Sequence, residues 1–291
     1  MLDLRNRFHR NSVRVVFDTN VFNGSTLDSL DHGPFRALCR SGRIVPIYGH
    51  ILQEELLRSY TNATKRTMLL ENWLPLISAT ASTLCRCHSE IWHDELVQGH
   101  GRHTRIFLSR FESEALLNSA KGLPRDGQMP RLALALQTVE KERLKIDSMR
   151  GRLRELREFK GVDELYGTTF STFLNGHLIR SGINMLDRAI DSNYSLAVAE
   201  RWARSPNSYP FFTQFVISAL YLPFHARVHQ NDRMDKNALA DLELMTHLLH
   251  SDILVSNEKG FLRKAFDDLW KQRRRVLMNS DEFAQWLNAA V

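Results

Sequence analysis

The chain has 291 residues, of which 43% are hydrophobic and 25% charged, and its formal net charge is +6. This length fits one large domain or two modest ones, and the composition is ordinary for a soluble globular protein. No apolar run approaches the roughly 20 residues of a membrane-spanning helix, and the N-terminus lacks an apolar signal core. The three cysteines cannot build a disulfide framework, so we expect a cytoplasmic protein without a membrane partner.

Four short segments near the two ends of the chain are predicted β-strands. They are apolar or β-branched runs with turn residues beside them, and in chain order they are Val13–Phe17, Arg43–Tyr48, Ile253–Val255 and Arg275–Met278. Helical patterns lie between and after them, at 33–39, 51–60, 238–249 and 261–272. A last helix is expected to begin at Phe283, capped by Ser280-Asp281-Glu282. Strands that alternate with helices predict an α/β fold with a parallel sheet.

The middle of the chain, residues 67–231, shows no convincing strand pattern. One long helix or a helical hairpin is predicted at 131–159, and further helices at 186–202 and 211–222. We therefore expect an α/β domain that is formed by residues 1–66 and 232–291 and interrupted by an all-helical insertion, residues 67–231.

The positive charge is concentrated in part of this insertion. Residues 102–160 hold fourteen Lys or Arg and eight Asp or Glu, whereas the remaining 25 basic and 25 acidic residues cancel. A basic segment on a neutral body is typical of a polyanion-binding protein. Four arginines at helical spacing are candidate phosphate contacts: Arg143, Arg150, Arg154 and Arg157. The alternative is a solvated helical face on which these arginines pair with nearby glutamates.

Polar and acidic side chains follow the first and the third predicted strand. Asp18-Thr19-Asn20 comes directly after Phe17, and Ser256-Asn257-Glu258 comes directly after Val255. Active sites of open α/β sheets lie beyond the carboxyl ends of the strands. Because Mg²⁺ and Mn²⁺ prefer hard oxygen ligands, two strands that deliver carboxylates to one sheet edge predict a divalent-metal site.

Helices can supply further carboxylates to this site, from Glu54 or Glu55 and from Asp241 or Glu243. Clustered acidic groups repel one another unless cations neutralise them, and a bound metal can activate water and stabilise the charge on a scissile phosphate. Taken alone, Asp18-Thr19-Asn20 could instead be a polar turn that caps a helix. Asp252 precedes its strand, at the opposite edge, and is expected to be a structural turn residue.

The pattern resembles the PIN-domain nucleases over about residues 12–66 and 232–287. The resemblance rests on Phe17–Phe22, Glu55-Leu56, Asp241, Val255–Phe261 and Ser280–Phe283. It implies a three-layer α/β/α fold with a central parallel sheet, and a Mg²⁺- or Mn²⁺-dependent endoribonuclease. By motif position it assigns metal-binding, catalytic roles to Asp18, Glu55, Asp241 and Glu258, supporting catalytic roles to Asn20 and Ser256, and a nucleic-acid contact to Lys259.

Two departures from the family pattern keep other functions open. Glu258 stands where the family usually has aspartate, and the insertion is far longer than in small toxin-type members. RNA is the expected partner, DNA is possible, and an inhibitory protein partner is left open. The alternatives are a catalytically inactive PIN-like RNA-binding protein and a DNA-directed nuclease of the flap-endonuclease type.

Three other classes of site are disfavoured. Cys85-Arg86-Cys87-His88, with His93, His100 and His103 nearby, does not match the spacing of common structural zinc sites. No glycine-rich phosphate-binding loop follows the predicted strands, which argues against a nucleotide-cofactor enzyme. The Asp-x-Asp pattern of one common phosphatase class is absent after Phe17.

Overall fold

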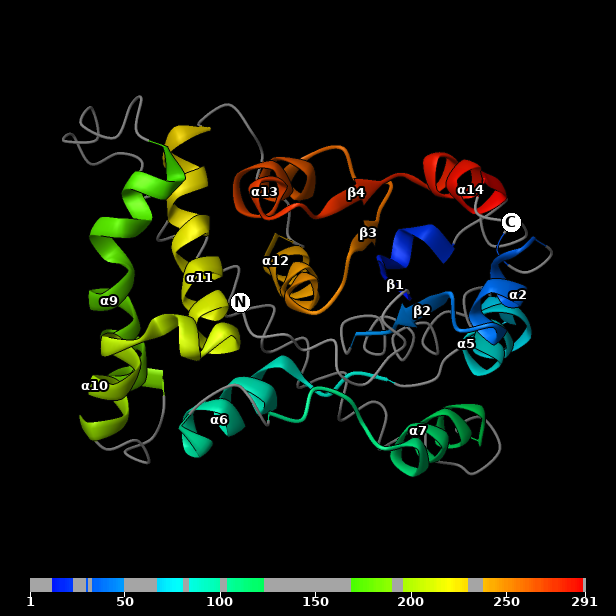
Figure 1. Ribbon diagram of the computed structural model, residues 1–291, viewed down its shortest axis with the longest axis horizontal. Coiled ribbons are helices and arrows are strands. Elements are labelled where there is room, and N and C mark those ends of the chain that lie inside the picture. Colours follow the sequence, from blue (N-terminus) through cyan, green and yellow to red (C-terminus); the bar gives the residue numbers. More distant parts are fainter. Residues whose placement is uncertain are drawn as a thin grey trace. The chain divides into compact units, whose positions relative to one another are not determined.

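A computed structural model of the chain describes residues 12–22, 30, 33–49, 67–80, 84–99, 104–122, 169–189, 196–229 and 238–289. It divides into two compact units (Figure 1). The sheet unit comprises the described residues of Leu4–Cys87, Ile106–Lys141 and His250–Val291, and the helical unit those of His88–Arg105 and Glu142–Leu249. Among these residues, no helix is both long and apolar enough to cross a membrane. The domain ranges 1–66, 67–231 and 232–291 stay predictions.

Four parallel strands form the centre of the sheet unit: β1 (Val13–Phe17), β2 (Ile44–Ile47), β3 (Ile253–Val255) and β4 (Val276–Met278). Their order across the sheet is β2-β1-β3-β4, so strands from the two ends of the chain lie side by side (Figure 1). In the register, Val15 of β1 pairs with Pro46 on one side and with Ile253 on the other. The predicted α/β class and parallel sheet are confirmed.

The strands β2, β1 and β3 are buried on both faces, as is usual for parallel strands, whereas the edge strand β4 is partly exposed. Alternate strand residues point to opposite faces, and Val15 and Phe17 belong to a core shared with α2 (Phe35–Arg40), α5 (Leu74–Thr80) and α14 (Ser280–Ala289). The ring of Phe17 lies 5.6 Å from that of Phe35 and 5.5 Å from that of Phe283, centre to centre. Val16, on the opposite face, is also completely buried.

The other helices of the sheet unit connect or flank the strands. They are η2 (Thr19–Phe22), η4 (Leu69–Trp73), α7 (Arg110–Gly122), α13 (Phe261–Leu269) and η9 (Lys271–Arg273). Two isolated β-bridges, Tyr48 with Leu84 and Cys85 with Phe107, fall partly or wholly within the segment predicted to be all-helical. The sequence pattern missed them because a single paired residue has no periodicity. The helices predicted at 51–60 and 131–159 lie outside the described residues.

The last helix, α14, begins differently from the prediction. The N–H of Glu282 donates to Asn279 Oδ1 at 2.9 Å, and the N–H of Asn279 donates to Glu282 Oε2 at 2.7 Å. This reciprocal pair is a capping box, in which two N–H groups that lack partners inside the helix are satisfied at once. The expected start at Phe283, with Ser280-Asp281-Glu282 as the cap, is therefore wrong: Asn279 caps the helix, and Ser280 is its first residue.

The helical unit contains α6 (His88–Gln98), α9 (Phe170–Ala189), α10 (Leu196–Arg204), η7 (Pro206–Ser208), α11 (Pro210–Val228), α12 (Ala238–Thr246) and η8 (His247–Leu249). α11 packs against α6, α9 and α12 and is buried on most of its circumference, so it is the central helix of this unit. The single helix predicted at 186–202 is wrong, because α9 ends at Ala189 and α10 begins at Leu196.

A buried carboxylate holds the start of α11. Glu95 of α6 is completely buried, and its two oxygens accept the N–H groups of Phe211 at 3.2 Å and Phe212 at 2.8 Å. These groups have no partner inside the helix, so Glu95 supplies one. Burial raises the pKa of Glu95 to about 8, against the opposing effect of the two hydrogen bonds.

This raised pKa predicts a pH-dependent stability. The pKa in the folded protein, about 8, exceeds the ordinary glutamate value of 4.5, so the free energy of unfolding should fall as pH rises between these values. The slope limit for one proton is about 1.4 kcal/mol per pH unit. At pH 5, Glu95→Gln should be less stable than the wild type, because its amide oxygen accepts only one of the two N–H groups. Its free energy of unfolding should then no longer fall with pH between 5 and 8. Thermal unfolding from pH 5 to 9 measures this, with exposed Glu90→Gln as control; parallel curves for wild type and Glu95→Gln would contradict it.

Candidate functional site

Asp18 lies at the carboxyl edge of the two central strands. Its N–H donates to the carbonyl oxygen of Val255 in β3 at 3.0 Å, and its own carbonyl accepts the N–H of Val21 at 3.2 Å. The β-branched run of β1 therefore ends at Asp18, and the polar residues that follow turn the chain into η2. A carboxylate at this position stands where open α/β sheets bind ligands.

The carboxylate of Asp18 accepts hydrogen bonds from three side chains. Ser256 Oγ donates to Oδ2 at 2.6 Å, Asn20 Nδ2 donates to the same oxygen at 2.7 Å, and Thr19 Oγ1 donates to Oδ1 at 3.3 Å. Burial nevertheless raises the pKa of Asp18 above its ordinary value, because the loss of hydration outweighs these bonds. The ionised form is thus held in place by neutral donors and disfavoured by its surroundings.

Ser256 joins the two polar segments through one hydroxyl group. It donates to Asp18, and its oxygen also lies 3.1 Å from the N–H of Glu258 and 3.4 Å from Asn20 Nδ2. A hydroxyl offers one donor and two acceptor positions, so these contacts use its whole capacity. Ser256 is buried, which leaves its oxygen little freedom to exchange these partners for water.

Asn257 ties three elements together around this cluster. Its N–H donates to Asn20 Oδ1 at 3.0 Å, and its side-chain oxygen accepts the N–H of Ser280, the first residue of α14, at 3.0 Å. The sequence analysis gave Asn257 no role. Its position between Ser256 and Glu258 was the available signal, since amide side chains commonly bind nearby backbone groups in turns.

Glu258 is half-buried and folds back on its own loop. Its Oε1 accepts the N–H of Gly260 at 3.0 Å. A Cβ atom at position 260 would lie 2.9 Å from this oxygen, so glycine allows the close approach.

The structure brings four predicted site residues into one hydrogen-bonded cluster: Asp18, Asn20, Ser256 and Glu258, the last through its backbone N–H. Asp241 is half-buried in α12 of the helical unit, so its convergence with Asp18 stays a prediction. Lys259 is exposed directly after Glu258. The other predicted site residues lie outside the described residues: Glu55, Arg143, Arg150, Arg154 and Arg157.

Asp252 has the structural role that was expected of it, at the opposite edge of the sheet. Its carboxylate accepts the backbone N–H of Arg14 at 3.0 Å and a guanidinium N–H of Arg275 at 3.3 Å. It therefore links β1 to the start of β4. The two edges of the sheet differ in chemistry, because Asp252 is paired with a cation and Asp18 is held by neutral donors.

The cysteine-rich segment is split between the two units. Cys85 is buried in the sheet unit, where its sulfur and a ring nitrogen of buried His250 lie within 4.8 Å of each other. Burial raises the pKa of the Cys85 thiol, which disfavours the thiolate that binds metals. His100 and His103 lie outside the described residues.

The oxygen atoms around Asp18 are suitable ligands for a hard divalent cation. They are carboxylate, hydroxyl and amide oxygens, which suit Mg²⁺ or Mn²⁺ better than soft metals. A cation beside Asp18 would lower the raised pKa of its carboxyl group. The residues that would hold such an ion here are Asp18 and Glu258.

Comparison with known proteins gave no match. No protein-family model, no curated protein and no solved structure matched the chain. Its function is therefore inferred from its own residues and their geometry.

Proposed function

We propose that this chain is a metal-dependent nuclease of the PIN-like type, and specifically an endoribonuclease that hydrolyses phosphodiester bonds at the carboxyl edge of its sheet. One observation carries the proposal. The half-buried carboxylate of Asp18 is oriented by Ser256 and Asn20, beside Glu258, where two central parallel strands end. RNA is favoured over DNA because the family that the sequence resembles acts mostly on RNA.

Ser256 and Asn20 orient the carboxylate of Asp18, and Asp18 binds the metal. Oδ2 of Asp18 accepts the two short hydrogen bonds, from Ser256 and Asn20, whereas the bond from Thr19 to Oδ1 is longer. We assign Oδ1 as the oxygen that binds Mg²⁺ or Mn²⁺, because its competing hydrogen bond is weaker. Ser256 and Asn20 hold the carboxylate in one rotamer, so binding requires little reorganisation.

Glu258 is proposed as a second ligand, with Asp241 and Glu55 completing the acidic set. Glu258 would exchange its bond to the N–H of Gly260 for the cation, a movement confined to the end of a flexible side chain. When bound, the ion supplies an activated water and neutralises charge on the scissile phosphate. The protein would hold the ion at one edge of the sheet, and the bound ion would favour the ionised form of Asp18.

The direct test is RNA cleavage that depends on a divalent metal. Purified protein is incubated with end-labelled single-stranded RNA, or with DNA of the same sequence, in Mg²⁺, in Mn²⁺ and in excess EDTA. We expect internal cleavage of RNA with either metal, loss of cleavage in EDTA and recovery when metal is restored. Undiminished cleavage in EDTA would exclude the metal mechanism. RNA binding without cleavage would favour the inactive RNA-binding alternative, and cleavage of DNA alone would favour the DNA-directed one.

A further inference from the structure

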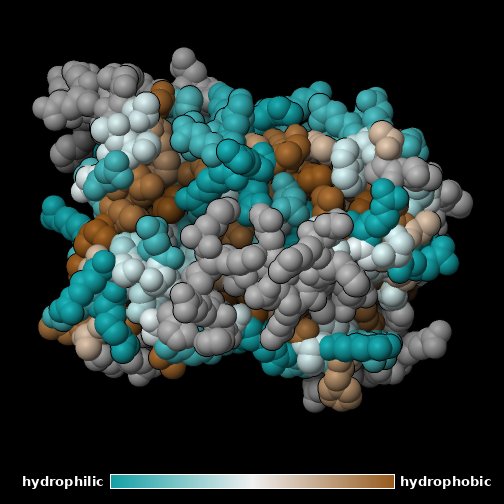
Figure 2. All heavy atoms as spheres, in the orientation of Figure 1, coloured by the Kyte–Doolittle hydropathy of each residue, from teal (hydrophilic) through white to brown (hydrophobic). Residues whose placement is uncertain are grey.

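A compact cationic segment links α13 to β4. It is Lys271-Gln272-Arg273-Arg274-Arg275, named the basic turn here. Short runs rich in Lys and Arg are typical of nucleic-acid contacts. This run lies outside the basic segment 102–160. Lys271, Arg273 and Arg274 are exposed, and hydrophilic side chains cover this part of the surface over α13 (Figure 2).

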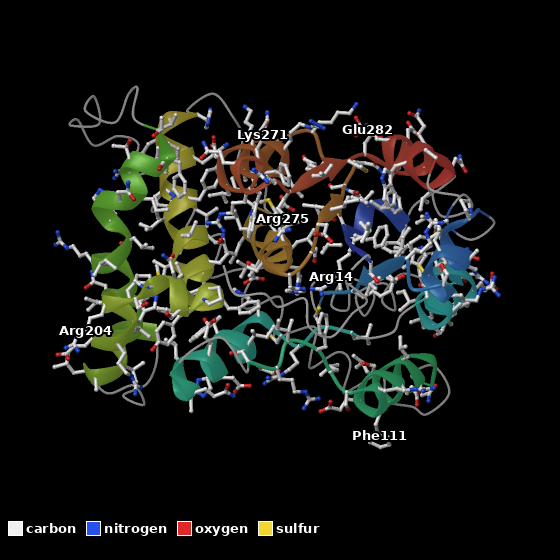
Figure 3. The ribbon with its side chains drawn as sticks, viewed as in Figure 1. Arg14, Phe111, Arg204, Lys271, Arg275 and Glu282 are labelled. Carbon is white, nitrogen blue, oxygen red and sulfur yellow. The ribbon has the colours of Figure 1, made fainter. Side chains whose placement is uncertain are left out.

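Two of the guanidinium groups in the basic turn have defined positions. The guanidinium carbon of Arg273 lies 4.8 Å from the ring centre of Trp270, and that ring is almost completely buried. Arg275, which is labelled in Figure 3, donates to Asp252 at 3.3 Å. Stacking on an aromatic ring leaves the N–H edge of an arginine able to bind phosphate oxygens.

Several positive charges lie close together in the turn. Asp267 lies 3.4 Å from Lys271, and Asp252 pairs with Arg275. The pKa of Arg273 is lowered by partial burial and by the nearby charge of Arg275. Arg274 has a φ of +58°, a left-handed conformation that is uncommon for residues other than glycine and that bends the chain sharply. An anion bound to the turn would relieve the mutual repulsion of the cations.

The basic turn and the Asp18 cluster stand at the two ends of one short edge strand. β4 begins at Val276, directly after Arg275, and the carbonyl of its last residue, Met278, accepts the N–H of Ser256 at 2.9 Å. Its three residues span about 10 Å at a rise of ~3.3 Å each.

We propose that the basic turn binds phosphates of a single-stranded RNA that continues along β4 to the Asp18 cluster. This inference rests on the proposed function, because it assigns the binding path of the same substrate. Arg273 and Arg274 supply phosphate contacts, and Trp270 orients Arg273 through its ring. The turn reads no bases by itself, because contacts to phosphate carry no sequence information.

The test measures RNA binding by the full chain in EDTA, so that neither metal nor cleavage enters the measurement. A fluorescent, cleavage-resistant 2′-O-methyl RNA is titrated at several salt concentrations, and its anisotropy reports binding. In Arg273→Gln/Arg274→Gln we expect about tenfold weaker binding and a log–log salt slope that is smaller by ~1.4, since each lost phosphate contact removes ~0.7 for a single strand. Arg273→Lys/Arg274→Lys should keep the slope, because the charges remain.

The matched control is Arg110→Gln/Arg204→Gln, which removes two exposed arginines that each pair with a glutamate four residues away. It should leave the salt slope unchanged. An unchanged slope in the basic-turn variant, or an equal change in the control, would overturn the inference. Polyglutamate tests for an acidic protein partner. If it displaced RNA from the wild type at equal charge concentration, and if its own binding depended on the basic turn, the inference would also be overturned.

The inference and the proposed function fail separately. If the basic turn governs RNA binding but no condition gives cleavage, the nuclease proposal fails and the RNA-binding surface stands. If RNA is cleaved with metal but the salt slope is unchanged in the basic-turn variant, the surface fails and the nuclease proposal stands.

Discussion

Asp18→Asn is expected to abolish metal-dependent RNA cleavage, lowering its rate by more than the roughly 10–100-fold that is typical when an outer-shell partner of a metal site is lost. An amide is a weaker ligand than a carboxylate for a hard divalent cation, and it brings no negative charge. The measurement is the single-turnover rate in Mn²⁺ at saturating protein. The control is Asp267→Asn, which makes the same substitution on the exposed face of α13 and should leave the rate unchanged.

The same variant should fold at least as well as the wild type when metal is absent. The asparagine oxygen can accept the hydrogen bonds from Ser256 and Asn20, and its amide can donate to the Thr19 hydroxyl. Because burial raises the pKa of Asp18 in the folded protein, its ionised form destabilises the fold above the ordinary carboxyl pKa.

The melting temperature of Asp18→Asn in EDTA should therefore exceed that of the wild type near neutral pH. The difference should disappear as pH falls to the ordinary carboxyl pKa of 3.8, where the wild-type group is protonated in the folded state. Full cleavage activity in the variant would refute the role of Asp18. A lower melting temperature at neutral pH would refute the account of its electrostatics.

Two glycines of α9 should respond to alanine with opposite signs. A Cβ atom at position 182 would lie 2.0 Å from an atom of the Trp202 indole, whereas nothing lies within 4 Å of a Cβ at position 176. Trp202 cannot easily move, since it is fully buried and its N–H donates to Thr213 Oγ1 at 3.0 Å. We expect Gly182→Ala to lower the free energy of unfolding by about 3 kcal/mol, the upper range of overpacking.

Gly176→Ala should instead raise the free energy of unfolding by roughly 0.5–1 kcal/mol. Alanine restricts the unfolded chain more than glycine does and meets no neighbour here. Urea denaturation followed by tryptophan fluorescence measures both variants under the same conditions. Similar effects at the two positions would show that Trp202 does not pack on the α9 backbone in the way described.

The strands that carry the site could be predicted from sequence because their signals are local. β1 and β3 have the same bounds as predicted, since each is an apolar run followed directly by polar residues. Asp252 could likewise be recognised as structural from its place before β3. The Asn279 cap was missed although its Glu282 partner is only three residues away. Serine is also a common cap residue, and Ser280 follows one position later.

Within the candidate site, sequence supplied residue types and tertiary structure supplied their partners. Ser256 and Asp18 are 238 positions apart, and their hydrogen bond exists only because β1 and β3 are neighbours in the sheet. The roles of Glu55 and Asp241 were assigned by family resemblance alone and stay predictions. The basic turn was visible as a run of Lys and Arg, but the stacking of Arg273 on Trp270 was not.

What the sequence by itself determined is therefore the α/β class, the strands that end in polar residues and the kinds of ligand atoms near their ends. These features follow from interactions between residues close in the chain, because periodicity and turn residues can be identified from consecutive positions. Only the tertiary structure decided that Ser256 serves Asp18, Asn20 and Glu258 at once, and that burial raises the pKa of Asp18. Strand order and burial depend on contacts between distant segments, which no local pattern specifies.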